Sequence, residues 1–179
     1  MIPGPPGGPG WNGRGPRLRT DIVELYILRP QGATFDLLQL RRVEPPLAGT
    51  WQPVMGHIEA GETSGAAAAR EAGEELALNL ADPQQCTDLF ALEQVHPFFI
   101  AEMDAVFLTP RLVGVVTPSW EPRMNGEHDA FRWTPVERAG ELFMWPGQRA
   151  AVAELVDLLR PSSGATLAAL RVDRSSLVR

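Results

Sequence analysis

Residues 56–78, GHIEAGETSGAAAAREAGEELAL, constrain the fold more than any other segment, because they predict a helix with a defined start. Thr63 precedes two small residues and four alanines, a pattern typical of an N-cap and the first helical turns. At about 100° per residue, Glu71, Glu74 and Glu75 share one stripe, which we expect to lie away from the core. The opposite side carries small and aliphatic residues that we expect to pack on the core: Ala69, Ala72, Leu76 and Leu80.

This stripe is unusually acidic for a solvent-exposed helix. Its three carboxylates rise over only about 6 Å along the helix axis. They repel one another by a few tenths of a kcal/mol per pair, and they lie in the half of the helix where the macrodipole disfavours negative charge. A divalent cation bound through oxygen atoms would compensate this charge. Arg70 could reach Glu74 and Glu62 and so orient the acids. Acidic helix faces are common, however, so the helix alone does not predict a metal site.

The spacing of the acids relative to the preceding glycine is more specific. The segment closely resembles the Nudix box, G-x5-E-x7-R-E-U-x-E-E-x-G-U, where U is a bulky aliphatic residue. The matching positions are Gly56, Glu62, Arg70, Glu71, Glu74, Glu75 and Leu78. Two positions depart from the motif: Ala72 stands for the bulky aliphatic residue and Ala77 for the last glycine. A glycine there would allow a positive φ at the helix exit, which alanine resists.

This resemblance implies an α/β fold, a Nudix α/β/α sandwich with a central mixed β-sheet. It also implies an enzyme that hydrolyses a nucleoside diphosphate linked to another group. By the same resemblance, the catalytic acids Glu71, Glu74 and Glu75 bind Mg²⁺ or Mn²⁺, with the Gly56 carbonyl as a further ligand. Glu62 and Arg70 are the implied positioning pair. The divalent ion would neutralise the diphosphate and acidify the attacking water, while a carboxylate takes the proton.

Three further segments, LLQLRR, TWQPVMGHIEAGET and GEHDAFRW, loosely resemble the bacterial branch that hydrolyses dihydroneopterin triphosphate and (d)ATP. The residues that carry this similarity are Trp51, Glu127, His128, Phe131 and Trp133. We therefore predict a pyrophosphohydrolase that acts on a nucleoside or pterin triphosphate. The alternatives are hydrolysis of ADP-ribose, a nucleotide sugar or a dinucleoside polyphosphate. A non-catalytic nucleotide sensor is less favoured, because all the acids are present.

Residues outside the motif add candidates for the chemistry. Glu127 is the candidate general base or extra metal ligand, with a solvated loop glutamate as the alternative. His128 could orient phosphate or make a structural hydrogen bond. Arg41 and Arg42 end a strand that runs toward the motif, and one of them is expected to meet substrate phosphate because alternate strand residues face opposite ways. Trp51 could stack on a flat base or pterin, or pack in the core.

Other aromatic and polar residues have simpler expected roles. Core packing is the preferred interpretation of Phe98 and Phe99, and His96 is expected to be structural. The role of His57 stays open. Cys86 is the only cysteine, which excludes an intrachain disulfide and favours a buried, inert thiol.

The rest of the chain predicts one domain with two tails. Residues 1–19 are expected to be a flexible Gly/Pro-rich tail, residues 20–160 the Nudix domain, and residues 161–179 a tail of uncertain structure. We expect a helix over residues 145–160. The expected strands cover residues 21–30, 35–42, 50–55, 87–96, 98–110, 112–117 and 130–135, with helix and strand hard to separate in the run 98–110.

Composition narrows the partners. The net charge of −6 argues against nucleic acid as the main partner but permits a small anionic substrate recruited by a metal. All 16 basic residues are arginines, which removes lysine-based phosphate or Schiff-base chemistry. No apolar run approaches the roughly 18 residues of a membrane span, and no apolar core of a signal peptide is present. We therefore expect a cytoplasmic protein without membrane contact. The resemblance to the Nudix family, in which dimers are frequent, implies a homodimer.

Overall fold

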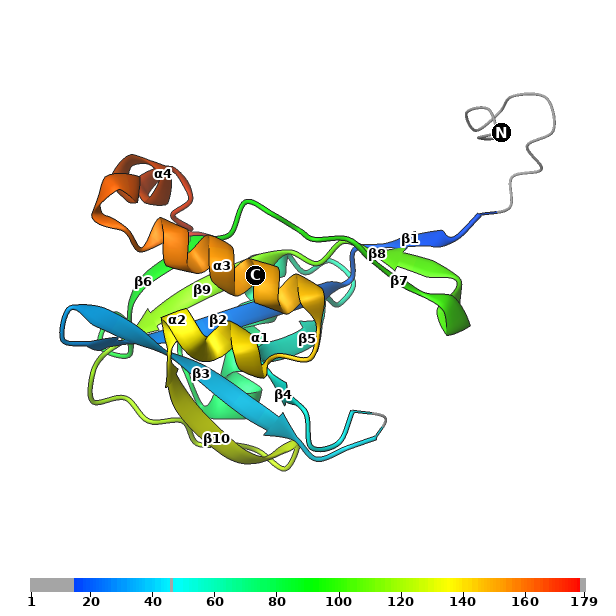
Figure 1. Ribbon diagram of the computed structural model, residues 1–179, viewed down its shortest axis with the longest axis horizontal. Coiled ribbons are helices and arrows are strands. Elements are labelled where there is room, and N and C mark those ends of the chain that lie inside the picture. The colour runs from blue at the N-terminus through cyan, green and yellow to red at the C-terminus, as the bar shows by residue number, and fades with distance from the viewer. Residues whose placement is uncertain (1–14, 46, 178–179) are drawn as a thin grey trace.

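A computed structural model describes residues 15–45 and 47–177, and its centre is a seven-stranded mixed sheet (Figure 1). Its main path has the order β10-β3-β2-β9-β6, with β4 paired to β3 and β5 paired to β2. The strands are β2 (Ile22–Gln31), β3 (Thr34–Arg42), β4 (Trp51–Gln52), β5 (Val54–His57), β6 (Cys86–Ala91), β9 (Arg111–Val116) and β10 (His128–Pro135). The sheet is mixed because β2 runs parallel to β9 and antiparallel to β3 and β5.

Helices cover both faces of this sheet. The principal helices are α1 (Ser64–Leu76), α2 (Val136–Ala139), α3 (Pro146–Leu158) and α4 (Gly164–Ala169). Alternate residues of β2 divide the core: Val23 and Leu25 pack with α1, whereas Tyr26 and Leu28 pack with α2 and α3. Figure 1 shows α2 and α3 in front of the sheet. This arrangement confirms the predicted α/β sandwich with a mixed central sheet, because strand residues alternate between two buried faces.

A second sheet extends away from the main body (Figure 1). It has three strands in the order β1-β8-β7, formed by β1 (Arg17–Arg19), β7 (Phe98–Ile100) and β8 (Ala105–Phe107). The run 98–110, expected as one strand, is therefore divided by the short 3₁₀ helix η1 (Ala101–Met103). Residues 17–19 pair with β8 and are strand rather than the expected flexible tail. Residues 1–14, the rest of that predicted tail, lie outside the described residues.

The segment after residue 160 lies against the domain. It contains three short helices, η3 (Pro161–Ser163), α4 and η4 (Arg174–Leu177). Between α4 and η4, Arg171 forms a β-bridge with Phe90 of β6, and the Val172 N–H donates to the Leu89 carbonyl at 3.0 Å. Leu177 is buried in the core cluster that includes α1. The segment of uncertain structure thus extends one edge of the central sheet.

Two further expectations concern the chain as a whole. Cys86 is fully buried in β6, and this burial raises the pKa of its thiol, as expected for an inert cysteine. In the part of the chain that the structure describes, no helix has the length and apolar character needed to span a membrane.

Candidate active site

Helix α1 begins and ends where its capping groups dictate. The Ala66 N–H donates to Thr63 Oγ1 at 3.1 Å, which confirms Thr63 as the N-cap. At the other end, Ala77 has φ +55 in the left-handed region, and the Leu78 N–H donates to the Ala72 carbonyl at 3.0 Å. The helix therefore ends in the left-handed turn that the motif's glycine would favour, with alanine in its place.

The acids of α1 do not all lie on an open face. The Glu74 side chain is 58% exposed, whereas Glu75 is only 1% exposed. The prediction that the whole stripe lies away from the core is therefore wrong for Glu75. One neighbour of its carboxylate comes from a distant strand, because the buried His128 of β10 lies 3.6 Å from Glu75 Oε2. A distant loop also lies against the helix backbone there: the N–H groups of Arg123 and Asn125 donate to the carbonyls of Leu76 and Glu75, both at 3.0 Å.

Arg70 holds several of the acids through its guanidinium. It donates to both carboxylate oxygens of Glu62 at 3.2 Å, to Glu71 Oε1 at 2.8 Å and to Glu74 Oε2 at 3.3 Å. It also donates to the His57 carbonyl at 2.7 Å, which ties α1 to the end of β5. The hydrogen bond to Glu62 is the main cause that raises the Arg70 pKa above its usual value. Arg70 thus brings together Glu62 and two acids of the stripe.

Gly56 lies in β5 against the carboxylate of Glu71. A Cβ atom on Gly56 would overlap the carboxyl carbon and Oε1 of Glu71. The Glu71 carboxylate can keep this place only while residue 56 has no Cβ, because it occupies the space that a Cβ would fill.

The carboxylates of the site influence one another. Burial raises the pKa of Glu75 to about 8, and the nearby charges of Glu127 and Glu71 add to this effect. Burial also raises the pKa of Glu71, with contributions from Glu74 and Glu127 that the contact with Arg70 opposes. Glu127 of the loop before β10 therefore belongs to the same electrostatic site as three acids of α1.

These residues fit a hard divalent cation. Glu75 Oε2 is buried without a hydrogen-bond partner among the described residues, and the surrounding acids are oxygen donors of the type that Mg²⁺ and Mn²⁺ prefer. Within residues 15–45 and 47–177, no three acidic, histidine or cysteine side chains are already gathered around one point. Glu71 and Glu74 each accept one hydrogen bond from Arg70, and their carboxylates keep further lone pairs that could bind an ion.

His128 lies beside Glu75 rather than facing solvent. His128 is the first residue of β10, and it is 4% exposed. Its Nδ1 is 3.6 Å from Glu75 Oε2, and its Nε2 is 3.2 Å from the side-chain nitrogen of Gln52. Burial lowers the pKa of His128, although the charge of Glu127 opposes the shift. Gln52 has no signal of its own in the sequence, because only the pairing of β4 and β10 with β3 brings it to His128.

The predicted substrate-binding arginines, Arg41 and Arg42, and Trp51 make contacts with other residues of the protein. Arg41 forms a two-point ion pair with Asp129 at 2.7 and 2.9 Å, and Arg42 Nε donates to the Glu44 carbonyl at 3.2 Å. The guanidinium of Arg132 stacks on Trp51 at 3.7 Å from the ring centroid. Arg132 was missed, since only the alignment of β10 beside β3 and β4 shows that it meets Trp51.

Other residues lie away from the acids. Phe98 and Phe99 are 37% and 56% exposed on β7, so the expectation that they pack in the core is wrong. The exposure follows from the three-stranded sheet, which no helix covers in the described part of the chain. His96 Nε2 is 3.9 Å from Glu154, and the His57 side chain is exposed.

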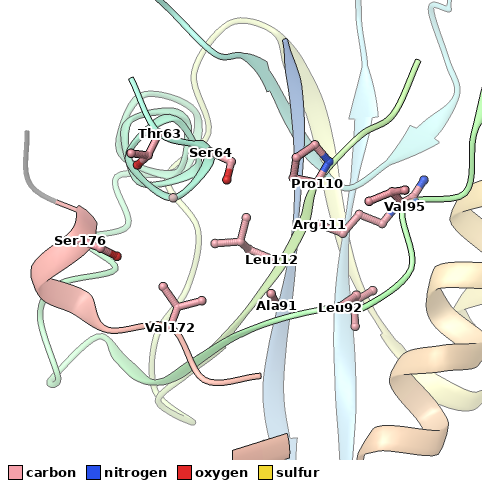
Figure 2. Close-up of a pocket in the computed structure, with 11 residues that line it drawn as sticks. Thr63, Ser64, Ala91, Leu92, Val95, Pro110, Arg111, Leu112, Val172 and Ser176 are labelled. Carbon is pink, nitrogen blue, oxygen red and sulfur yellow. The ribbon is translucent and has the colours of Figure 1, made fainter. Parts of the chain in front are cut away.

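A cavity of about 300 Å³ lies at the opposite, N-terminal end of α1 (Figure 2). Figure 2 shows Thr63 and Ser64 of this helix end on one side, with Leu112, Val172 and Ser176 around the space. Its lining includes none of the acids of the motif. The candidate active site is therefore the acidic end of α1 with β5 and the start of β10, and this cavity is a separate feature.

Comparisons with known proteins agree with this architecture. The NUDIX domain family matches residues 18–155. An octanoyltransferase of Myxococcus xanthus is 34% identical over 143 residues, which cover 76% of this chain and 36% of that protein. This chain thus spans little more than a third of that relative. A candidate 8-oxo-dGTP diphosphatase of Mycobacterium tuberculosis is 33% identical over 131 residues, covering 71% of this chain and 84% of that one.

Solved structures share the fold at lower identity. The Escherichia coli dihydroneopterin triphosphate pyrophosphohydrolase has a TM-score of 0.63 and 23% identity over 80% of this chain and 97% of its own. An Ap4A hydrolase of Caenorhabditis elegans has a TM-score of 0.64 and 20% identity over 79% of this chain and 98% of its own. These likenesses show the fold, and the match over residues 18–155 shows the family. The chain belongs to the NUDIX domain family.

Proposed function

We propose that this chain is a Mg²⁺- or Mn²⁺-dependent pyrophosphohydrolase that cleaves a nucleoside or pterin triphosphate. The observation that carries the proposal is Glu75 Oε2, which is buried without a hydrogen-bond partner among the described residues and is influenced by the charges of Glu71 and Glu127. A buried carboxylate oxygen near other acids is unfavourable on its own, and these acids offer the oxygen donors that a hard cation needs.

The relatives support a triphosphate substrate. The Mycobacterium tuberculosis relative, 33% identical, is named for 8-oxo-dGTP, which is a nucleoside triphosphate. A structural neighbour is named for dihydroneopterin triphosphate, although at 23% identity it supports the fold and not the substrate. Dihydroneopterin triphosphate, dATP and 8-oxo-dGTP are therefore the substrates to test first.

Glu71, Glu74, Glu75 and the Gly56 carbonyl would hold the cation. When bound, such an ion neutralises the diphosphate and acidifies the attacking water. Arg70 orients the acids through its hydrogen bonds to Glu62, Glu71 and Glu74. These bonds keep the negatively charged carboxylates close together, where an ion would bind. Glu127 is exposed on a loop and coupled to the buried acids, which suits it to take the proton of the attacking water.

Two groups of alternatives predict different products. Hydrolysis of ADP-ribose, a nucleotide sugar or a dinucleoside polyphosphate would use the same acids on a different diphosphate. The NUDIX domain of Shewanella oneidensis NrtR, solved with ADP ribose, shares the fold at 12% identity. A sensor would bind nucleotide without turnover, and it is disfavoured because every acid of the motif is retained.

A substrate panel with product identification tests the proposal. The full chain is incubated with Mg²⁺ and each of dATP, 8-oxo-dGTP, dihydroneopterin triphosphate, ADP-ribose, a nucleotide sugar and Ap4A. We expect pyrophosphate and the matching monophosphate from at least one triphosphate, with activity abolished by EDTA and restored by excess Mg²⁺. Products from ADP-ribose, the nucleotide sugar or Ap4A alone would contradict the triphosphate assignment. Tight nucleotide binding without any turnover would support a sensor instead.

A further inference from the structure

Contact with substrate does not explain a row of three buried side chains, Gln52, His128 and Glu75. It links three separate elements, β4, β10 and α1. All three residues are at most 6% exposed. His128 lies in the middle, 3.2 Å from the Gln52 nitrogen and 3.6 Å from Glu75 Oε2. A side chain enclosed in this way is better placed to hold its neighbours than to meet a ligand in solvent.

The contact between Gln52 and His128 determines which nitrogen of the imidazole carries the proton. The side-chain nitrogen of Gln52 is only a donor, so His128 Nε2 accepts its hydrogen. In a neutral imidazole, the proton is then on Nδ1. Nδ1 faces Glu75 Oε2 at 3.6 Å, slightly beyond hydrogen-bond distance, and both atoms are buried without a hydrogen-bond partner among the described residues. The three residues therefore form a row in which Gln52 donates to the imidazole and the Nδ1–H faces the carboxylate.

The other contact of Glu75 makes the orientation specific. The backbone of Met55, directly before Gly56, lies close enough to the Glu75 carboxylate to oppose the rise of its pKa. The carboxylate thus has β5 on one side and the His128 imidazole on another. A carboxylate oxygen keeps a further lone pair when it accepts one hydrogen bond, so Glu75 remains able to bind a cation. Outer partners of this kind set the direction of a metal-binding carboxylate, and their loss lowers metal affinity.

We propose that His128, held in its Nδ1–H tautomer by Gln52, is a positioning residue that orients Glu75, and that it does not contact the substrate. The inference rests on the proposed role of Glu75 as a cation ligand. It replaces the expectation that His128 binds substrate phosphate, because the imidazole is buried and directed to the acid.

The tautomer is the first readout, and it needs neither metal nor substrate. Nitrogen-15 NMR of the histidine-labelled full chain, with His128 assigned by its loss in His128→Asn, reports which ring nitrogen carries the proton. We expect protonated Nδ1 and unprotonated Nε2. Gln52→Met removes the donor and is expected to shift His128 toward a mixture of tautomers. A protonated Nε2 with a bare Nδ1 in the unchanged chain would overturn the proposal.

The second readout is Mn²⁺ affinity, measured without substrate by electron paramagnetic resonance. His128→Leu removes the donor, and we expect Mn²⁺ to bind about 10–100-fold more weakly. His128→Asn places an amide N–H near the position of Nδ1 and is expected to restore affinity close to that of the unchanged chain. His96→Asn is the matched control, since His96 lies beside Glu154 and its φ of +33 suits asparagine. Thermal melts establish that each variant is folded.

The outcomes separate this proposal from the proposed function. If Glu75→Gln weakens Mn²⁺ binding but folded His128→Leu does not, His128 is not a positioning residue and the metal site stands. Equal losses in His128→Leu and His128→Asn would also contradict it, because the N–H would then be unimportant. If the unchanged protein binds no Mn²⁺, the proposed function fails. The tautomer measurement still decides whether the Nδ1–H of His128 faces Glu75.

Discussion

The single hydrogen atom that forms the side chain of Gly56 affects the geometry of the whole candidate site. Because it has no Cβ, the carboxylate of Glu71 can lie directly against the backbone of β5. Glu71 is in turn bonded to Arg70, which also holds Glu62. One residue's lack of a side chain therefore allows the backbone carbonyl and the acids to approach the same point.

Gly56→Ala should separate activity from stability. The added methyl group overlaps the flexible end of Glu71, so that carboxylate would move while the strand stays in place. We expect the free energy of unfolding to change by less than about 1 kcal/mol. Because a misplacement of about 1 Å can cost about 100-fold in rate, we expect a fall of that order in Mg²⁺-dependent turnover.

Urea unfolding and steady-state assays on the most active substrate measure these two effects. Gly126→Ala is the control, because a Cβ there meets no atom within 4 Å and its φ is not positive. Full turnover in Gly56→Ala would mean that Glu71 and the Gly56 backbone do not act together.

At the scale of elements, α1 was predictable because its signals are local. Thr63, the alanine run and the spaced acids define its start, its apolar face and its chemistry within 23 residues. The unusual Ala77 was also informative, since the structure gives it the positive φ that the motif's glycine would adopt.

Ala77→Gly should stabilise the protein. An alanine in the left-handed region is strained, and glycine removes that strain but adds freedom to the unfolded chain. The net effect is expected to be a gain of about 0.5–1 kcal/mol in the free energy of unfolding, measured by urea denaturation. The same substitution at Ala153, exposed within α3, should cost about 1 kcal/mol. A loss of stability in both variants would contradict the role assigned to the helix exit.

Features that depend on distant pairing were not predictable from local patterns. Glu75 is buried beside His128, which lies far along the chain from α1. Strand β1 exists only because residues 105–107 lie beside it, and a Gly/Pro-rich neighbourhood gave no sign of this pairing. The contact of Gln52 with His128 likewise needs β4 and β10 to flank β3. Helical periodicity places a side chain on a face, but it does not say what covers that face.

At the scale of the molecule, the C-terminal segment closes the sandwich on the side of β6. The family match ends at residue 155, and the chain then continues through α4 to the β-bridge at Arg171 and to η4. Leu177 ends this path against Gly65, where a Cβ would lie 3.3 Å from a Leu177 methyl group. The segment therefore packs against the start of α1, the helix that carries the acids.

Leu177→Ala tests whether this contact stabilises the domain. The side chain is 7% exposed in the core cluster of α1, so we expect a loss of about 2 kcal/mol in the free energy of unfolding. Leu18→Ala is the control, because Leu18 is 65% exposed and should change stability by less than about 0.5 kcal/mol. Equal stability of the two variants would show that the contact of Leu177 with α1 does not stabilise the domain.

The central claim is that the acids of α1 hold the divalent cation needed to cleave a phosphoanhydride bond. The most direct test compares Mg²⁺-dependent pyrophosphate release by the unchanged chain, Glu75→Gln and Glu141→Gln. Glu141 is an exposed acid in η2, far from the motif, and serves as the matched control. Loss of a cation ligand removes several kcal/mol of transition-state stabilisation, so Glu75→Gln should lose at least about 100-fold in turnover at saturating substrate. Glu141→Gln should keep the original rate. Equal turnover in all three proteins would contradict the account.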